Sequence, residues 1–197
     1  MAGFERRGLR GTARLTAASI ERHVENGGSL LEIGGGPGLI GISLLASGAV
    51  ARVTTIDLSP SWTEPARDLA DRQGVSERVE RIVGDVVAMA PQLEGADVVV
   101  AHRVVCCYPD WKAMMSAVAT LTGRWVTITF PAARWWNRLA VGLTNLVMRL
   151  RQVRFRAFVH PPEQMLAELE GAGLRVRADA VGLVWRTVML ERTGSSS

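Results

Sequence analysis

The hydrophobic positions of this chain follow two spacings that alternate along the sequence. Short, nearly continuous apolar or β-branched runs are typical of buried parallel strands, and they occur near residues 30–33, 52–57, 79–85, 96–102 and 124–130. Between these runs, apolar residues recur at helical spacing near 39–45, 61–73 and 110–122. This alternation predicts an α/β protein with a doubly wound, mostly parallel sheet, helices on both faces and a single domain.

The two ends of the chain depart from the alternation. We expect a loose arm up to about residue 12 and a helix over 16–26 that Gly27 and Gly28 end. After Pro161 and Pro162 the pattern predicts a helix over 165–171 and strands over 174–180 and 183–192. The predicted organisation is an N-terminal arm and helix (1–28), a main domain (29–192) with a helical lid insertion (132–158), and a disordered tail (193–197).

A glycine-rich turn follows the first predicted strand in the sequence LLEIGGGPG, residues 30–38. Such a turn before a helix lets a ligand lie against bare backbone and meet unpaired N–H groups. One register, Gly36, Gly38 and Gly41, satisfies the dinucleotide pattern G-x-G-x-x-G. The other starts at Glu32 and is acidic-x-G-x-G-x-G. We favour the second, because its carboxylate stands at a strand end where a cationic ligand would need it.

Two further strands also end near a carboxylate. Asp57 lies about 20 residues past the glycine turn, where nucleotide-binding α/β folds place an acid that accepts hydrogen bonds from ribose hydroxyls. As an alternative, Asp57 could begin a turn and cap the next helix. The third strand closes on Gly84 and Asp85. Three acidic strand ends in succession indicate an adenosine-containing ligand.

The order of these motifs from about residue 29 to residue 131 resembles the class I S-adenosylmethionine (SAM) dependent methyltransferases. The resemblance implies a Rossmann-like fold with SAM as cofactor, Glu32 near its methionine end and the glycines beneath it. It also implies that Asp57 binds the ribose and that Asp85 accepts from the adenine amine. The predicted cofactor-binding residues are Glu32, Gly34, Gly36, Gly38, Asp57, Leu58, Gly84, Asp85, Val86 and His102.

A narrower resemblance concerns two later stretches. RVVCCYP, residues 103–109, is similar to a stretch of the magnesium-protoporphyrin O-methyltransferases, and FRAFVHPPE, residues 155–163, is similar to a downstream stretch of that family. The match retains Tyr108, Pro109 and His160. The family's histidine, which is thought to assist transfer to a propionate carboxylate, falls on Cys107 here. The departure indicates a relative with a different acceptor, since a thiol with an ordinary pKa is a poor base at neutral pH.

Three side chains are candidates for catalysis: His102, Cys107 and His160. Imidazole titrates near neutral pH, so either histidine could act as a base. Each also has a structural alternative, since His102 could bind strand-end backbone and His160 could cap a helix. Cys107 could be a nucleophile, but Cys106 and Cys107 also suit a wall of small apolar residues. Neither cysteine has metal-site spacing, and we predict no metal.

The lid insertion contains an amphipathic helix over about 134–151. On a helical wheel its polar side chains fall within about 60° of one another: Arg134, Arg138, Asn145, Arg149 and Gln152. The remaining face is apolar and includes Trp135 and Trp136. Three kinds of surface could pack against this apolar face. It could pack on the protein's own sheet, roof a pocket for a flat or greasy acceptor with the tryptophans as walls, or contact a membrane peripherally.

Composition narrows the class of protein. A chain of 197 residues can form a core without metals or disulfides. The net charge is +4, but the arginines are spread along the chain, which argues against nucleic acid as a partner. The first residues carry no apolar core of a signal peptide, no apolar run reaches membrane-spanning length, and the only two cysteines are neighbours. We therefore expect a cytoplasmic protein; its oligomeric state stays open.

Together these features predict a SAM-dependent methyltransferase acting on a small-molecule acceptor that is aromatic or hydrophobic, and planar in one interpretation. The sequence does not decide whether oxygen, nitrogen or carbon is methylated. Two alternatives remain: a non-catalytic SAM-binding partner protein, and a nicotinamide-dependent oxidoreductase that would use the Gly36 register.

Overall fold

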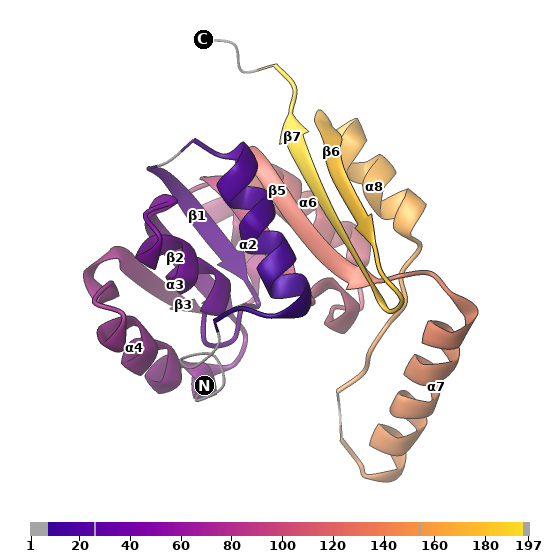
Figure 1. Cartoon of the computed structure of the whole chain (residues 1–197). Helices are drawn as coiled ribbons and strands as arrows, with labels where there is room; N and C mark the ends of the chain where they lie inside the picture. The colour runs from indigo at the N-terminus through magenta and orange to yellow at the C-terminus, as the bar shows by residue number, and fades with distance from the viewer. Residues whose placement is uncertain (1–7, 26, 154, 195–197) are drawn as a thin grey trace.

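A seven-stranded sheet forms the centre of the computed structural model, which describes residues 8–25, 27–153 and 155–194 (Figure 1). The strand order is β3-β2-β1-β4-β5-β7-β6. The first five strands are parallel, β7 is antiparallel to β5, and β6 pairs with β7 as a hairpin. The strands are β1 (Gly28–Ile33), β2 (Val50–Asp57), β3 (Val79–Val83), β4 (Ala96–His102), β5 (Thr122–Pro131), β6 (Leu174–Val181) and β7 (Trp185–Arg192).

Helices cover both faces of the sheet, as the alternation of strand and helix predicts. Successive strand residues point to opposite faces, so Leu30 joins one buried cluster and Leu31 joins the other. The first cluster includes residues of α2 (Gly11–His23), α3 (Leu39–Ala46) and α4 (Thr63–Arg72). The second includes residues of α5 (Val86–Met89), α6 (Trp111–Leu121) and α8 (Pro162–Gly171). The two cores enclose the sheet between them. Because β1 to β5 are parallel, their carboxyl ends share one edge of the sheet.

The sequence predicted the type and order of the main elements, with shifts at their ends. The first helix begins at Gly11 rather than at residue 16, because Thr16, Ala17 and Ile20 are buried in the middle of a longer helix. A 3-10 turn, Pro60–Trp62, precedes α4. The short helix α5 and the 3-10 turns Ser76–Arg78, Ala90–Gln92 and Val105–Cys107 were not predicted. Each is a turn or less of helix, too short to show a period in the sequence.

The predicted arm and tail lie partly outside the described residues, which exclude 1–7 and 195–197. Two parts of these predictions were wrong. Residues 11 and 12 of the arm belong to α2. Thr193, placed in a disordered tail, donates from its backbone N–H and its hydroxyl to the carbonyl of Gly173, at 2.9 and 3.0 Å.

The predicted lid helix is α7 (Trp135–Leu150), which follows β5. Figure 1 shows it beyond the carboxyl edge of the sheet, apart from the helices that cover the two faces. Asn137 is the one buried residue of α7. The interpretation in which the apolar face of this helix packs on the sheet was therefore wrong. Within the described residues, no helix has both the length and the apolar character required to cross a bilayer.

Candidate functional site

A cavity of about 470 Å³ lies at the carboxyl edge of the sheet, beside the ends of β1, β2, β3 and β4. This is the edge where open α/β sheets bind ligands. Six of the ten predicted cofactor-binding residues line it: Gly34, Asp57, Leu58, Gly84, Asp85 and Val86. The other lining residues are Ile33, Ile56, Ser59, Trp62, Arg103, Val104, Cys107, Tyr108, Met114 and Phe155.

The glycine turn has the left-handed backbone that its sequence requires. Gly34, Gly36 and Gly38 have φ values of 62°, 57° and 74°. Gly36 is held from two sides: its N–H donates to Asp57 Oδ2 at 2.9 Å, and its carbonyl accepts from Arg81 Nη1 at 2.9 Å. The turn is therefore tied to β2 and β3 before any ligand binds.

Asp57, the last residue of β2, organises the backbone around it. Besides the bond to Gly36, its Oδ1 accepts from the N–H of Ser59 at 2.9 Å. Both bonds come from backbone donors, and each carboxylate oxygen has a further lone pair for another donor. The side chain is half-buried and faces the cavity, so it is placed to accept hydrogen bonds from a ligand as well.

Glu32 lies beneath the glycine turn and is buried. Its Oε2 accepts from the N–H of Gly41 at 2.8 Å, in the first turn of α3. Burial is the largest influence on this group and raises the pKa of Glu32 to about 7, against the lowering effect of the bonds from the backbone of Gly41 and Ile40. Glu32 is not among the residues that line the cavity, and neither are Gly36 and Gly38. The carboxylate thus supports the turn from below.

Asp85 follows β3 and begins α5. Its Oδ1 accepts from the N–H of Val87 at 2.9 Å, which is an N-cap bond. Its Oδ2 accepts from the hydroxyl of Tyr108 at 3.0 Å. Burial and this bond to a carboxylate raise the pKa of Tyr108. Asp85 and Tyr108 therefore join the end of β3 to the stretch after β4 across one wall of the cavity.

His102 ends β4 and is paired rather than free. Its Nε2 lies 2.9 Å from the Thr12 hydroxyl of α2, and it does not line the cavity. Burial, with the charge of Arg103 second, lowers the pKa of His102 to about 4. An imidazole with so low a pKa is neutral at pH 7 and accepts a proton poorly.

His160 also binds the protein itself. Its Nε2 lies 3.1 Å from the carbonyl of Val105 and 2.9 Å from the carbonyl of Tyr108. Because carbonyl oxygens only accept, this nitrogen carries the proton. Burial is the main cause of a lowered pKa for His160. The histidine fixes the stretch that ends at Tyr108, and it does not line the cavity.

Cys107 is the one catalytic candidate of the three on the cavity wall. Its Sγ lies 3.8 Å from Sγ of Cys106 and 3.9 Å from the carbonyl of Arg103. The thiol of Cys106 is buried and donates to the carbonyl of Arg103 at 3.4 Å, and its contact with Cys107 lowers the pKa of Cys107. Partial thiolate character is therefore available on the side of the pair that faces the cavity.

The acceptor side of the cavity is built from two stretches far apart in sequence. The backbone N–H of Phe158 donates to the carbonyl of Cys106 at 2.8 Å, and the bonds of His160 join the same two stretches. The segment returning from α7 thereby brings Phe155 onto the cavity. The interpretation in which Trp135 and Trp136 wall an acceptor pocket does not apply to this cavity, since neither lines it and Trp135 is 71% exposed.

Sequence reasoning missed several side chains near the cavity. Trp62 lines it and lies over the glycine turn, where a Cβ added at Gly36 would meet the indole at 3.5 Å. Arg103 has φ of 59° and its guanidinium lies 4.0 Å from the ring centre of Trp185. Met114 and Arg81 were also missed. Arg103 is the exception, because it directly follows a predicted strand end, which placed it beside the ligand site of an open α/β sheet.

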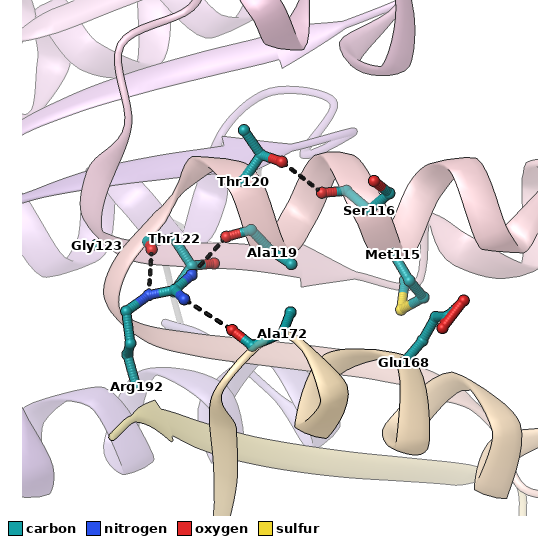
Figure 2. Close-up of a pocket in the computed structure, with 9 residues that line it drawn as sticks. All are labelled: Met115, Ser116, Ala119, Thr120, Thr122, Gly123, Glu168, Ala172 and Arg192. Atoms are coloured by element: carbon teal, nitrogen blue, oxygen red, sulfur yellow. Dashed lines mark hydrogen bonds between the residues drawn. The ribbon is translucent and has the colours of Figure 1, made fainter. Parts of the chain in front are cut away.

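A larger hollow of about 710 Å³ lies away from this site, between α6 and α8 near the start of β5 (Figure 2). One side chain, Arg192 at the end of β7, occupies its rim. Its guanidinium donates to the carbonyls of Thr122, Ala172 and Ala119 at 3.0, 2.9 and 2.6 Å. These carbonyls lie at the ends of α6 and α8, where helical carbonyls run short of backbone donors, so this hollow is a structural junction.

Comparisons with known proteins agree with the geometry of the carboxyl edge. Residues 30–123 match the family model described as "Methyltransferase domain". The chain is 36% identical over 98 residues to ribosomal protein L11 methyltransferase of Yersinia pseudotuberculosis, which covers 50% of this chain and 32% of that protein. The chain therefore spans about a third of the length of this curated relative.

Solved structures share the fold over nearly the whole chain. Magnesium protoporphyrin IX methyltransferase from Synechocystis PCC 6803 with bound S-adenosylhomocysteine has a TM-score of 0.72 at 20% identity, covering 92% of this chain and 82% of that one. An O-methyltransferase family protein from Burkholderia thailandensis has a TM-score of 0.75 at 16% identity, covering 94% and 56%. Residues 30–123 are therefore a methyltransferase domain, a family whose methyl donor is S-adenosyl-L-methionine, and this match favours the Glu32 register of the glycine turn over the dinucleotide register.

Proposed function

We propose that this protein transfers the methyl group of SAM to a small, hydrophobic and planar acceptor. The observation that carries the proposal is the arrangement of one cavity at the carboxyl edge. The ends of β2 and β3 bring Asp57 and Asp85 to it, and Gly34 lines it at the start of the glycine turn that Glu32 supports. The two parts of such a cavity, one for the donor and one for the acceptor, are assigned below.

The donor side consists of the strand ends and the glycine turn. Asp57 is assigned to the ribose hydroxyls, because its oxygens face the cavity next to the turn. Asp85 is assigned to the adenine amine, with Leu58 and Val86 as apolar contacts for the ring. The backbone of Gly34, Gly36 and Gly38, supported by Glu32, is assigned to the methionine end.

The acceptor side consists of Cys107, Tyr108, Met114 and Phe155. These side chains present sulfur, aromatic and aliphatic surface, which suits a flat apolar ligand. The bonds of His160 and Phe158 hold this wall in place without entering the cavity. His160 is thus assigned as a positioning residue, and His102 is assigned to the packing of α2 against the strand end.

The proposed chemistry follows from the absence of both histidine candidates from the lining of the cavity. SAM, when bound, supplies a methyl group activated for displacement, and the protein aligns the acceptor and keeps water out. Neither His102 nor His160 lines the cavity, so an acceptor atom that is already nucleophilic at neutral pH, such as a carboxylate, suits the site. Cys107 is the side chain assigned to any proton that must be removed.

The relatives support this proposal at different levels. The Synechocystis structure belongs to a methyltransferase named for a porphyrin, which is planar and hydrophobic. The Yersinia relative is named for a protein substrate, and the match covers only part of it. The apolar character of the acceptor wall favours the small molecule. A cytoplasmic location stays a prediction of the sequence.

Calorimetric titration with SAM, S-adenosylhomocysteine and NADH tests the donor assignment. We expect micromolar binding of the two adenosyl ligands and none of NADH. A radiolabelled methyl-transfer assay with porphyrins and aromatic carboxylic acids then tests the acceptor assignment. Binding of SAM without transfer to any acceptor in a broad metabolite panel would support a non-catalytic SAM-binding protein instead.

A pair of neighbouring variants separates the acceptor wall from the donor site. Phe155→Ala should lower turnover at limiting acceptor by about tenfold while SAM affinity stays within about twofold of wild type. Val153→Ala is the matched control, because Val153 is also an exposed apolar residue of the return segment but does not line the cavity. Equal effects of the two substitutions would remove Phe155 from the acceptor wall.

A further inference from the structure

Helix α7 exposes a continuous apolar row to solvent. Five large side chains of one helix face are each between 52% and 75% exposed, and we call them the outer row: Trp135, Leu139, Leu143, Leu146 and Leu150. A row of this size on one helix marks an interaction surface. In Figure 1 the helix stands beyond the carboxyl edge of the sheet, where no other labelled helix lies.

Hydrogen bonds from the opposite face fix the direction of the outer row. The side-chain amide of Asn137 donates to the carbonyls of Ala132 and Val184 at 2.7 and 2.9 Å. One turn before the end of the helix, Asn145 exchanges two bonds with the backbone of Ala157, at 2.8 and 2.9 Å. Rotating the apolar row inward would break all four bonds. The row is therefore held outward, away from the other segments that the structure describes.

The hairpin between β6 and β7 extends the apolar surface. Leu183 is 72% exposed at its tip, with Val184 beside it. The indole Nε1 of Trp136 donates to the carbonyl of Leu183 at 3.2 Å, which places the start of α7 against this tip. The exposed hairpin tip therefore adjoins the start of α7, at Trp136 and Asn137.

The charges along the α7 segment have a single sign. The sequence contains no Asp or Glu between residues 111 and 162. Arg138 and Arg149 lie along one border of the outer row on the helical wheel, and Arg151 follows its last residue. An apolar face with arginines at its borders and tryptophan at one end fits a bilayer interface with anionic headgroups.

The same charges disfavour a second copy of this chain as the occupant. In a two-fold contact through α7 the same patch would face itself. The arginine borders of the two helices would meet, and the α7 segment provides no carboxylate to pair with them. Helix α7 is too short to cross a membrane, because its 16 residues extend about 24 Å and the hydrocarbon core of a bilayer is about 30 Å thick.

We propose that α7 and the hairpin tip dock this protein peripherally on an anionic membrane surface. The outer row would enter the interface while Arg138, Arg149 and Arg151 lie at the level of the headgroups. This inference concerns an interaction surface and does not depend on methyl transfer. It can be tested without donor or acceptor.

Vesicle flotation with purified full-length protein tests the proposal. Vesicles of phosphatidylcholine alone are compared with vesicles that also contain phosphatidylglycerol. We expect the wild type to float with the anionic vesicles and to release progressively as salt is raised. Failure of the wild type to float with anionic vesicles, or equal binding to both vesicle types, would overturn the proposal.

Two sets of variants locate the surface. Leu143→Asp should weaken anionic-vesicle binding by about tenfold or more, and the double variant Arg138→Gln with Arg149→Gln should weaken it by several-fold and reduce its salt dependence. Val176→Asp, an exposed valine of β6 outside α7, is the matched control and should bind like wild type. Wild-type SAM affinity in each variant shows that the fold is intact.

Sedimentation of the same proteins in the absence of lipid tests whether a second copy of this chain binds the outer row. We expect a species whose association state does not change with Leu143→Asp. A wild-type dimer that Leu143→Asp dissociates would assign the outer row to a second copy. That result, like unchanged vesicle binding by Leu143→Asp, would refute membrane docking by α7.

Discussion

Two hollows in the described part of this protein have opposite characters. The one between α6 and α8 is larger, about 710 Å³, and Arg192 closes its rim by donating to three backbone carbonyls. The one at the carboxyl edge is smaller, about 470 Å³, and collects side chains from four strand ends and from the segment after α7. Volume alone would therefore identify the wrong hollow as the ligand site.

What separates the two hollows is where their polar groups come from. At the Arg192 junction, the polar groups are helix-terminal carbonyls that need a partner for folding. At the carboxyl edge, carboxylates sit on glycine-rich or turning backbone that already satisfies them with N–H donors, and their remaining lone pairs face open space. The first hollow serves stability and the second is suited to a ligand, which gives separable experimental outcomes.

The largest expected effect is on stability at the Arg192 junction. Arg192→Ala removes three charge-assisted bonds that join the ends of α6 and α8 to β7, so the free energy of unfolding should fall by about 3–4 kcal/mol. Urea denaturation measures this, and calorimetry should show unchanged SAM affinity. Arg177→Ala is the control, because its ion pair with Glu191 is half-exposed and should contribute less than about 1 kcal/mol. A loss of SAM binding without a loss of stability would reverse the assignment.

The second effect is a pH dependence that originates beneath the glycine turn. The pKa of Glu32 is raised from 4.5 to about 7 on folding. The folded state therefore binds the proton more tightly, and the stability that Glu32 contributes is complete below about pH 4.5 and is lost as pH rises through about 7. At about 1.4 kcal/mol for each pH unit between the two values, the loss reaches about 3 kcal/mol.

Glu32→Gln tests this dependence, because it keeps an oxygen for the N–H of Gly41 and removes the titration. The unfolding free energy of the wild type minus that of the variant should fall by about 3 kcal/mol between pH 4.5 and pH 8, measured by urea denaturation without SAM. Glu80→Gln, at an exposed carboxyl group of β3, should show no such change. A pH-independent difference for Glu32→Gln would mean that folding does not raise the pKa of Glu32.

The third effect compares two carboxylates that both bind backbone N–H groups, one at each edge of the sheet. Asp57→Ala should weaken SAM binding by about 1–3 kcal/mol, or about five- to 150-fold, through lost ribose bonds and a loosened Gly36. Asp97, at the start of β4, accepts from the N–H and hydroxyl of Ser29. Asp97→Ala should lower stability and leave SAM affinity unchanged. Unchanged SAM affinity in Asp57→Ala would remove Asp57 from the donor site.

The sheet and the acidic strand ends could be predicted because they depend on local patterns. Buried parallel strands need apolar runs, and the parallel arrangement then brings their carboxyl ends to one edge, so Asp57 and Asp85 could be placed together from sequence alone. The glycine turn could be predicted for a similar reason, because a positive φ strongly favours glycine over other residues.

The rest of the site depends on contacts between segments distant in sequence. His160 binds Val105 and Tyr108 more than 50 positions away, and nothing local to His160 indicates carbonyl partners rather than a catalytic role. A helical wheel could also not predict which way the apolar face of α7 points. The wheel identified its apolar face, but the bonds of Asn137 and Asn145 to other segments decide that this face points outward.

The smallest expected effect concerns the contact between the donor and acceptor sides of the cavity. Tyr108→Phe removes the hydroxyl that donates to Asp85 Oδ2 and keeps the ring on the wall. Asp85 still accepts from Val87, so SAM affinity should change by less than about 1 kcal/mol, or about fivefold. The loss of the tether should instead raise the KM for the acceptor, because the wall that Tyr108 joins is no longer fixed to β3. Calorimetry and steady-state kinetics measure the two quantities. A large loss of SAM affinity with an unchanged acceptor KM would place Tyr108 on the donor side.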